Sequence, residues 1–251
     1  MILTPATYHS PDANRYYLSH SQYSDFLSCE AMALAKLSGD YRPERTRACL
    51  QGQMFHAWAA GELTAFLDST PAVYKQKGGL YAEYGEVMTM IAALERDPCA
   101  MELLGGQKRV IITAELYGVP WKACLDVYRP AQRQIIDVKT ARVIDVAFFE
   151  IYGYLRQAAI YAELERIAAG REAGDWCDSY LLMVTKESPP DKGLISLVDK
   201  ERFAAELSLI AATMPRIVAL KQGRTAPVRC ETCPHCRATK VLGEAIHYTA
   251  L

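Results

Sequence analysis

The stretch VPWKACLDVYRPAQRQIIDVKTAR, residues 119–142, decides the fold of this chain because it describes two apolar strands joined by a polar turn. Asp126 lies in the first strand, and Asp137 and Lys139 lie in the second. Side chains alternate between the two faces of a β-strand, so Asp137 and Lys139 project from the same face. Pro130 and its polar neighbours suit a turn between antiparallel strands. A hairpin of this kind would bring Asp126 beside Asp137.

Two carboxylates and an amine that converge on one spot are costly unless something neutralises the anions. A divalent cation with oxygen ligands, Mg²⁺ or Mn²⁺, is the usual solution, and the carbonyl of Val138 adds a further oxygen. Such an ion lowers the pKa of a bound water, and Lys139 could orient that water or stabilise charge at an attacked phosphate. The competing interpretation of a D-x-K tripeptide alone is a surface aspartate followed by a lysine, because short motifs recur by chance.

Two residues upstream could join this site. Glu115 precedes Asp126 across the turn at Gly118, and we expect it at the rim of the same cluster. His56 follows Gly52 by four positions on an expected helix, where small residues would let another element approach closely. A neutral imidazole is a good ligand for Mn²⁺, although a buried, hydrogen-bonded histidine is the simpler interpretation.

A third feature is the segment YLRQAAIY on the helix expected over 144–169. Gln157 and Tyr161 are four residues apart and therefore share one face of that helix. A glutamine and a tyrosine that face a metal site can hold a phosphate or the attacking water. The edge of an ordinary amphipathic helix would show the same spacing.

The bulk composition excludes several classes of protein. The chain has 251 residues, of which 51% are hydrophobic and 23% are charged, and its formal net charge is −1. These values predict one globular domain over residues 1–251 and argue against a generally basic nucleic-acid coat protein. No segment reads as a secretory signal or a membrane span, so we expect a cytoplasmic protein with no membrane partner. Phosphate-cradling glycine motifs are absent, so ATP-driven and dinucleotide-driven functions lack support.

The periodicity of apolar residues predicts an α/β fold with a central mixed sheet of four to five strands flanked by helices. Helices are expected near residues 19–30, 48–65, 85–104, 144–169 and 200–220. Strands are expected near 109–117, 121–128, 134–139, 179–185 and 193–198. The tail from about 221 to 251 reads as a loop.

The cysteines fall into two groups. Cys49, Cys99, Cys124 and Cys177 stand alone and are expected to be mostly small buried residues. By contrast, Cys230, Cys233 and Cys236 form a C-x2-C-x2-C pattern that needs a fourth ligand. Cys29 and His235 are the candidates. Soft sulfur ligands indicate zinc or an iron–sulfur cluster.

Taken together, these motifs resemble the PD-(D/E)xK nuclease superfamily, and specifically its RecB/RecE-like exonuclease branch. The family order is a helical Gly-x-x-x-His, an acidic residue, an Asp at a hairpin, (D/E)-x-K and Gln-x-x-x-Tyr. This chain shows the same order as Gly52–His56, Glu115, Asp126, Asp137-Val138-Lys139 and Gln157–Tyr161. The resemblance covers roughly residues 19–240 and rests on five short motifs in order.

The resemblance implies a restriction-endonuclease-like core that hydrolyses DNA phosphodiesters with Mg²⁺ or Mn²⁺. It implies that the metal ligands are His56, Asp126, Asp137 and the Val138 carbonyl. Lys139 would be catalytic, and Gln157 and Tyr161 would assist at the DNA backbone.

The resemblance also bears on the cysteines. Some RecB-like nucleases place one cysteine before the nuclease core and three after it, and the four hold a [4Fe–4S] cluster that clasps the chain ends. This favours [4Fe–4S] on Cys29, Cys230, Cys233 and Cys236, with Zn²⁺ as the alternative. The spacing between the last two cysteines is two residues here, where those relatives have five.

We therefore expect a DNA exonuclease of phage-type or bacterial recombination or DNA processing. It would act on linear ends, single- or double-stranded, either as a ring-shaped homo-oligomer or with a recombinase or annealing protein. The basic residues expected to contact phosphates are Lys122, Arg129, Arg133, Arg142 and Arg156. The alternatives are a non-catalytic DNA-binding or assembly module of the same fold and a structure- or site-specific endonuclease.

Overall fold

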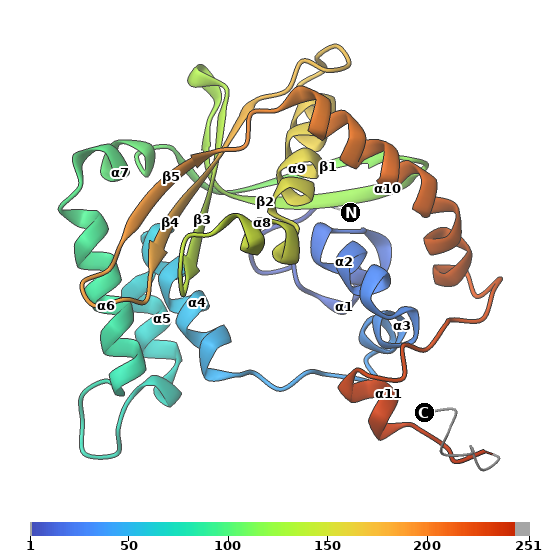
Figure 1. Cartoon of the computed structure of the whole chain (residues 1–251), viewed down its shortest axis with the longest axis horizontal. Helices are drawn as coiled ribbons and strands as arrows, with labels where there is room; N and C mark the ends of the chain where they lie inside the picture. The colour runs from blue at the N-terminus through green and yellow to red at the C-terminus, as the bar shows by residue number, and fades with distance from the viewer. Residues whose placement is uncertain (1, 244–251) are drawn as a thin grey trace. The chain divides into compact units, whose positions relative to one another are not determined.

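A computed structural model describes residues 2–243, and within them five strands form one mixed sheet in the order β1-β2-β3-β4-β5 (Figure 1). The strands are β1 (Gln107–Leu116), β2 (Val119–Arg129), β3 (Gln134–Ala141), β4 (Asp178–Thr185) and β5 (Lys192–Ser196). Strands β1, β2 and β3 are antiparallel neighbours, β3 and β4 run parallel, and β4 and β5 are antiparallel. The expected mixed sheet flanked by helices is confirmed.

The helices of the described residues are α1 (Pro11–Tyr16), α2 (His20–Ser28), α3 (Glu30–Ser38), α4 (Arg47–Ala59), α5 (Leu63–Ser69), α6 (Ala82–Glu95), α7 (Pro98–Leu103), α8 (Val146–Tyr152), α9 (Tyr154–Ala168), α10 (Lys200–Lys221) and α11 (Pro234–Ala238). Short 3₁₀ turns occur at Pro71–Val73 and Pro130–Gln132. The second of these turns closes the β2–β3 hairpin, and Arg133 completes it with a φ of 55°.

Two predicted helices are each divided in two by a local signal. The helix expected over 85–104 breaks at Asp97, whose carboxylate accepts hydrogen bonds from the first backbone N–H groups of α7. Pro98 begins that new helix, a position where proline is tolerated. The helix expected over 144–169 breaks at Gly153, whose φ of 62° lies in the left-handed region that glycine adopts without strain. The sequence analysis also did not predict α1, α3 and α11.

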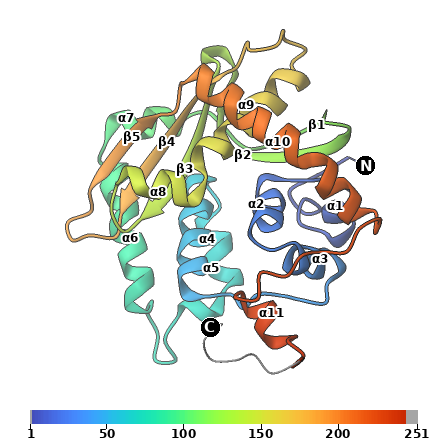
Figure 2. The same cartoon turned by 45° about the vertical axis from the view of Figure 1, so that its right-hand side comes forward.

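The two faces of β3 carry different neighbours. Ile136 and Val138 are buried in a large apolar core with residues of α4, α6 and α7. Ile135 and Asp137 alternate with them and line a small cavity against α9. Figures 1 and 2 show α4 and α6 and, across the sheet, α9 (yellow). The acidic residue of the strand therefore faces α9, which carries the glutamine and tyrosine motif.

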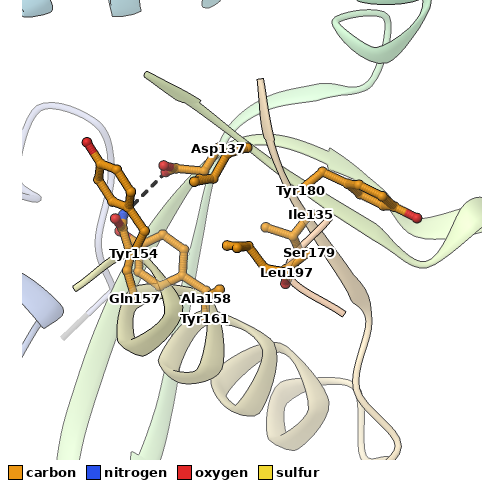
Figure 3. Close-up of a pocket in the computed structure, with 10 residues that line it drawn as sticks. Ile135, Asp137, Tyr154, Gln157, Ala158, Tyr161, Ser179, Tyr180 and Leu197 are labelled. Carbon is orange, nitrogen blue, oxygen red and sulfur yellow. Dashed lines mark hydrogen bonds between the residues drawn. The ribbon is translucent and has the colours of Figure 1, made fainter. Parts of the chain in front are cut away.

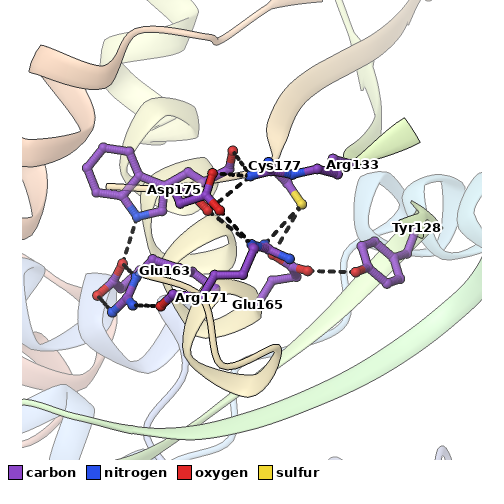
Figure 4. A network of polar contacts seen from close by, with 9 residues as sticks. Tyr128, Arg133, Glu163, Glu165, Arg171, Asp175 and Cys177 are labelled. Atoms are coloured by element: carbon purple, nitrogen blue, oxygen red, sulfur yellow. Dashed lines mark hydrogen bonds and ion pairs between the residues drawn. The ribbon is translucent and has the colours of Figure 1, made fainter. Parts of the chain in front are cut away.

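The far end of α9 is fixed by a buried polar network (Figure 4). The carboxylate of Glu165 accepts hydrogen bonds from Tyr128 on β2 (2.6 Å) and from the thiol of Cys177 (3.1 Å), and it forms an ion pair with Arg171. Arg133, in the β2–β3 turn, forms an ion pair with Asp175. These contacts join α9 to the sheet, and Cys177 is buried among them.

The chain divides into two compact units. Unit 1 comprises Met1–His20 and Glu44–Ala212 and contains the sheet. Unit 2 comprises Ser21–Pro43 and Thr213–Leu251, so it contains both the N-terminal segment and the tail that we expected to be joined by the cysteines. The organisation as one nuclease domain stays a prediction.

The long helix α10 is, by length and composition alone, apolar enough to cross a membrane. Its buried residues recur at spacings of three and four: Phe203, Leu207, Ile210, Met214, Ile217 and Leu220. This single stripe is the pattern of a helix that packs one face against protein.

Candidate active site and cysteine cluster

The two aspartates lie on neighbouring strands at the point where those strands separate. The β2–β3 ladder ends with Val127 opposite Ile136, so the same register places Asp126 opposite Asp137. Beyond that pair, Oδ2 of Asp126 accepts a 3.0 Å hydrogen bond from the backbone N–H of Val138. A side chain thus replaces the next rung of the ladder, and the gap between the strands is lined by carboxylates.

His56 approaches the same gap from α4. Its Nδ1 atom lies 3.2 Å from Oδ1 of Asp126. Thr46 caps the start of α4 by accepting a hydrogen bond from the N–H of Cys49. A Cβ added at Gly52 would meet nothing within 4 Å, so the expectation of a close approach at this glycine is wrong for the described residues. Instead, Gly52 leaves open space one turn away from the histidine.

Lys139 and Gln157 hold Asp137 from two sides. The amine of Lys139 forms an ion pair with Oδ2 of Asp137, and Nε2 of Gln157 donates a 3.2 Å hydrogen bond to Oδ1 (Figure 3). Tyr161 lines the same small cavity as Asp137 and Gln157. The hydrogen bond from Gln157 to Asp137 therefore links the α9 motif to the strand motif. We call His56, Asp126, Asp137 and Lys139 the carboxylate cluster.

Burial and neighbouring charges raise the pKa of Asp137 and lower the pKa of Asp126. Burial raises the pKa of Asp137; the charge of Lys139 opposes this rise without cancelling it, and the charge of Asp126 adds to it. Burial also opposes the charge of Asp126, but His56 and Lys139 outweigh it and lower the pKa of that carboxyl. Burial disfavours the charged forms of His56 and Lys139, yet the aspartates raise the pKa of both. The raised pKa of Asp137 marks a negative charge that another cation would stabilise.

The residues present fit a hard divalent ion. Asp126 and Asp137 supply carboxylate oxygens, and His56 supplies an imidazole already beside one of them. The N–H and carbonyl of a strand residue point to the same edge, so the carbonyl of Val138 faces the gap that its N–H enters. Oxygen ligands with one imidazole suit Mg²⁺ or Mn²⁺ better than a soft metal.

The cavity between β3 and α9 is too small for a substrate. It measures about 10 Å³ and is lined by Asp137, Tyr154, Gln157, Tyr161 and neighbouring apolar residues. That volume accommodates about one water molecule. A substrate must therefore approach the carboxylate cluster from the open side of the strand gap.

Glu115 does not join the carboxylate cluster. It lies near the β1–β2 turn, paired with Pro120, and it is exposed. Asp126 lies six residues along β2 from that pair, and a strand rises by roughly 3.3 Å per residue. The expected position of Glu115 at the rim of the site is therefore wrong for this structure.

Lys122 is also not placed to contact phosphates. It is 1% exposed, and its Nζ donates to the carbonyl of Tyr8 and, at 2.7 Å, to Oδ1 of Asn14. The ring of Tyr8 lies 4.6 Å from the same amine. An ammonium group enclosed in this way holds the N-terminal segment to β2.

The other four expected basic contacts also differ in their accessibility. Arg129 pairs with Glu102 at 3.3 Å, and Arg133 belongs to the network at the far end of α9. Arg156 pairs with Glu206 at 3.1 Å, while Arg142 is exposed just beyond β3. Arg133 and Arg142 are both exposed, but Arg133 is held in an ion pair with Asp175, so Arg142 remains the candidate for a phosphate contact.

The sequence analysis missed two residues beside Lys139. His20, the first residue of α2, is half-buried. Loss of solvation lowers its pKa to about 4, and the charges of the nearby Lys139 and Arg156 add to that effect. Tyr154 places its ring 5.8 Å from Nζ of Lys139. Its spacing was a usable signal, because Tyr154 precedes Gln157 by three residues and so lies on the same helical face. No comparable signal pointed to His20.

The four cysteines of the C-terminal pattern and the N-terminal segment come together in unit 2. We call Cys29, Cys230, Cys233 and Cys236 the cysteine cluster; their Sγ atoms all lie within 4.8 Å of one another. Cys29 and Cys236 are separated by 3.5 Å, and Cys230 and Cys236 by 4.0 Å. Cys29 also begins α3 and Cys233 begins α11, each as the N-cap residue.

Backbone N–H groups point at the sulfur atoms. The N–H of Met32 donates to Sγ of Cys29 at 3.4 Å. The N–H of Cys233 donates to Sγ of Cys230 at 3.3 Å, and the N–H of Cys236 donates to Sγ of Cys233 at 3.4 Å. Hydrogen bonds to sulfur favour the thiolate, which is the form that binds a metal. His235 lies instead with its ring 5.3 Å from that of Tyr41.

The sulfur spacing can be compared with what each of the two expected metal centres requires. Around one tetrahedral zinc ion, neighbouring sulfurs stand about 3.8 Å apart, because the zinc–sulfur distance is about 2.3 Å. A [4Fe–4S] cluster places four iron atoms between the thiolates and needs the sulfurs further apart. Two of the observed separations, 3.5 and 4.0 Å, are close to the value for a single tetrahedral ion, and the identity of the group held by the four cysteines stays a prediction.

Comparisons with known proteins agree with the fold. Residues 19–239 match the DUF3799 family, described as a PDDEXK-like domain of unknown function. A crystal structure described as a "putative exonuclease" from Eubacterium rectale superposes on this chain with a TM-score of 0.90. The two sequences are 33% identical, and the match covers 100% of this chain and 98% of the other. The structure of SSO0001, at 13% identity, 85% and 93% coverage and a TM-score of 0.32, is too distant to support an argument. A comparison with curated proteins found no match.

Proposed function

We propose that this chain, which belongs to the DUF3799 family of PDDEXK-like domains, is a metal-dependent deoxyribonuclease that removes nucleotides from linear DNA ends. The observation that carries the proposal is the register of the β2–β3 hairpin. It places Asp126 opposite Asp137 where the ladder ends, with His56 and Lys139 bound to the two carboxylates.

Each residue has a distinct part in the proposed reaction. His56, Asp126, Asp137 and the carbonyl of Val138 would hold Mg²⁺ or Mn²⁺. When bound, this ion lowers the pKa of a water and neutralises charge on the attacked phosphate. Lys139 orients the attacking water or stabilises the charge that develops on the phosphate oxygens.

Gln157 and Tyr161 would act at the DNA backbone. The amide of Gln157 holds Asp137 in its present orientation and can turn its remaining donor towards a phosphate oxygen. Burial and the Asp137 charge raise the pKa of Tyr161 well above its usual value, so its hydroxyl remains protonated. A neutral hydroxyl can donate to a phosphate oxygen without adding negative charge.

The decisive experiment uses linear and closed circular DNA of the same sequence with Mn²⁺. Wild type should release nucleotides from labelled linear ends and leave the closed circle intact. Asp137→Ala and Lys139→Ala should be inactive, whereas Asp68→Asn, which alters an exposed carboxylate on α5, should match wild type. The position of the label reports the polarity of cleavage.

The alternatives make different predictions in the same assay. A non-catalytic DNA-binding or assembly module would bind DNA but release no nucleotide, with wild type and both active-site variants alike. An endonuclease would cut the closed circle. Either result would overturn the exonuclease proposal.

We further propose that the cysteine cluster holds structural Zn²⁺. Four thiolates at this spacing complete a tetrahedral site without an open position, which is the arrangement of structural zinc. Anaerobically purified protein should be colourless and contain about one zinc per chain. A brown protein with broad absorption near 400 nm would instead establish an iron–sulfur cluster.

The proposed biological setting is recombination or DNA processing in the cytoplasm. The nuclease would act as a ring-shaped homo-oligomer or together with a recombinase or annealing protein. Light scattering of the full chain, alone and with linear DNA, measures the assembly. A monomer under both conditions would contradict the ring.

A further inference from the structure

Lys186 is a cation without a counter-ion at the end of the sheet. It follows β4 directly, and its backbone N–H donates a 2.9 Å hydrogen bond to the carbonyl of Ala141, the last residue of β3. Its side chain is half-buried, and the amine donates a 2.8 Å hydrogen bond to Oε1 of Gln51 on α4. Within residues 2–243, no carboxylate forms an ion pair with this amine, so its positive charge is not neutralised.

A buried amide fixes the position of this cation. Gln51 is 6% exposed, and its Nε2 donates a 2.7 Å hydrogen bond to the backbone carbonyl of Glu83. A carbonyl can only accept, so the amide must present its oxygen to Lys186. A neutral amide oxygen orients an ammonium group without cancelling its charge. The ammonium group has three donors, and two of them are left for another acceptor.

Lys186 lies near the carboxylate cluster, on the side of the sheet from which α4 approaches (Figure 1). Along the sheet, the β4 residue opposite Lys139 precedes Lys186 by three positions, which corresponds to roughly 10 Å. Along α4, Gln51 precedes His56 by five residues, or about 7.5 Å. Gly52, which follows Gln51, leaves open space on the helix between these two positions.

The chemistry of the proposed reaction identifies the missing acceptor. A nuclease that removes nucleotides from a DNA end binds a chain of phosphates, of which one is attacked at a time. Successive phosphates of one strand advance about 3.4 Å along a duplex. A cation about 10 Å from the reacting group therefore meets a phosphate roughly two or three nucleotides from the bond that is cut.

We infer that Lys186 binds this second phosphate and that Gln51 positions its amine for the contact. This inference rests on the proposed nuclease function. A phosphate contact contributes affinity and fixes the register of the strand without reading its bases. The competing role is structural, with the amine of Lys186 serving only to fasten α4 to the sheet. The two roles differ in what the positive charge does.

Binding without cleavage tests that charge. The full-chain Asp137→Asn variant is titrated with an end-labelled linear duplex, and fluorescence anisotropy is measured over a series of NaCl concentrations. Adding Lys186→Gln should reduce the slope of log K against log salt concentration by about 0.9, the value of one phosphate contact. Lys186→Arg keeps the charge and should retain the slope. Lys77→Gln, which removes the charge of an exposed lysine in a turn, should also retain it.

A neutral phosphate locates the contact in the active protein. Linear substrates with one methylphosphonate, which carries no negative charge, at successive positions are cut by wild type with Mn²⁺. KM should rise by about tenfold when the neutral group lies two or three nucleotides from the cut bond, the size of one hydrogen bond to a charged group. The kcat should stay within about twofold, because the contact is made equally before and during the reaction. Lys186→Gln should show no further rise at that position, because both changes remove the same contact.

The outcomes separate the two proposals. A wild type that cuts no DNA contradicts the nuclease function, whatever the salt slopes show. An active wild type whose salt slope and methylphosphonate profile match those of Lys186→Gln contradicts the phosphate contact alone. A lower melting temperature of Lys186→Gln with an unchanged salt slope would assign the amine to fastening α4 and would also overturn the contact.

Discussion

The carboxylate cluster and the cysteine cluster both carry metal-type ligands, but they are stabilised in different ways. In the carboxylate cluster, each acidic side chain already has a basic partner: His56 for Asp126 and Lys139 for Asp137. The cysteine cluster consists of four sulfur atoms that face one another. Among the described residues, the small apolar core around it has three buried members, Cys29, Ala31 and Cys236. We therefore expect the first site to fold without an ion and the second to depend on one.

The largest expected effect tests this dependence in unit 2. Cys236→Ser should lose the zinc and lower the free energy of unfolding of unit 2 by about 5 kcal/mol or more, because structural zinc binding is a large part of the folding free energy of small metal sites. Thermal unfolding followed by circular dichroism measures the loss, and a strong chelator should reproduce it in wild type. Cys99→Ser, which changes an exposed cysteine outside the cluster, is the matched control. Equal stability of Cys236→Ser and Cys99→Ser would contradict the contrast.

The next effect concerns Lys139. Lys139→Met keeps most of the apolar part of the side chain but leaves Asp137 without its cation. Cleavage should fall by about 10²–10³-fold, and the metal-free protein should lose about 3 kcal/mol of stability. Added Mn²⁺ should restore more stability to this variant than to wild type, because the ion then neutralises both carboxylates. A melting temperature insensitive to Mn²⁺ would argue against ion binding here.

Lys122 and Arg142 separate a structural cation from a DNA contact. Lys122→Met should cost about 2 kcal/mol, because Tyr8 and Asn14 lose the donor to their buried acceptors. It should leave the salt dependence of DNA binding unchanged. Arg142→Ala should instead reduce that salt slope by about 1 with little change in stability. Fluorescence anisotropy over a series of salt concentrations measures the salt dependence of DNA binding for both variants. A smaller salt slope for Lys122→Met, with an unchanged slope for Arg142→Ala, would show that Lys122 contacts DNA.

A smaller effect is expected at Glu30 in unit 2. Its carboxylate accepts two 2.7 Å hydrogen bonds from Arg216 and one of 2.7 Å from the N–H of Val228. The bond from Arg216 is the main reason that the pKa of Glu30 is lowered. Because the folded pKa is below the unfolded one, the stabilisation is present above about pH 4.5 and is lost as the pH falls through the folded value.

Glu30→Gln should therefore cost about 1 kcal/mol near neutral pH. The difference from wild type should shrink at acid pH, where the wild-type side chain is itself protonated. Thermal unfolding of wild type and Glu30→Gln over the same range of pH measures this difference in stability. A difference that does not change with pH would mean that the charge of Glu30 is not the source of the stabilisation.

The smallest effect is at Glu115. Glu115→Gln should change the rate of cleavage by no more than about twofold and should leave the stability unchanged. Substitutions of exposed residues outside a site or a buried network are usually neutral. End-labelled cleavage measures it. A large loss of activity would place this carboxylate in the site after all.

Features with short-range causes could be predicted from the sequence. The polar turn between two apolar segments predicted the β2–β3 hairpin, and the period of two placed Asp137 and Lys139 on one face. The spacing of four put Gln157 and Tyr161 on the face of α9 that meets them. In each case the deciding residues are close together in the chain, so local geometry determines the outcome.

The failures depend on partners that are distant in sequence. Nothing near Lys122 indicates that Tyr8 and Asn14 enclose its amine, and nothing near Glu115 shows that β1 is long enough to carry it away from Asp126. The sequence spacing of Cys230, Cys233 and Cys236 does not contain the sulfur–sulfur distances across the fold, so the choice between zinc and an iron–sulfur cluster stays a prediction.

The central claim is that the carboxylate cluster binds a divalent ion independently of the cysteine cluster. Calorimetric titration of zinc-loaded protein with Mn²⁺ tests it most directly. We predict saturable binding to wild type that is lost in Asp126→Asn and Asp137→Asn and retained in Asp68→Asn. Equal Mn²⁺ binding by wild type and both active-site variants would contradict the account.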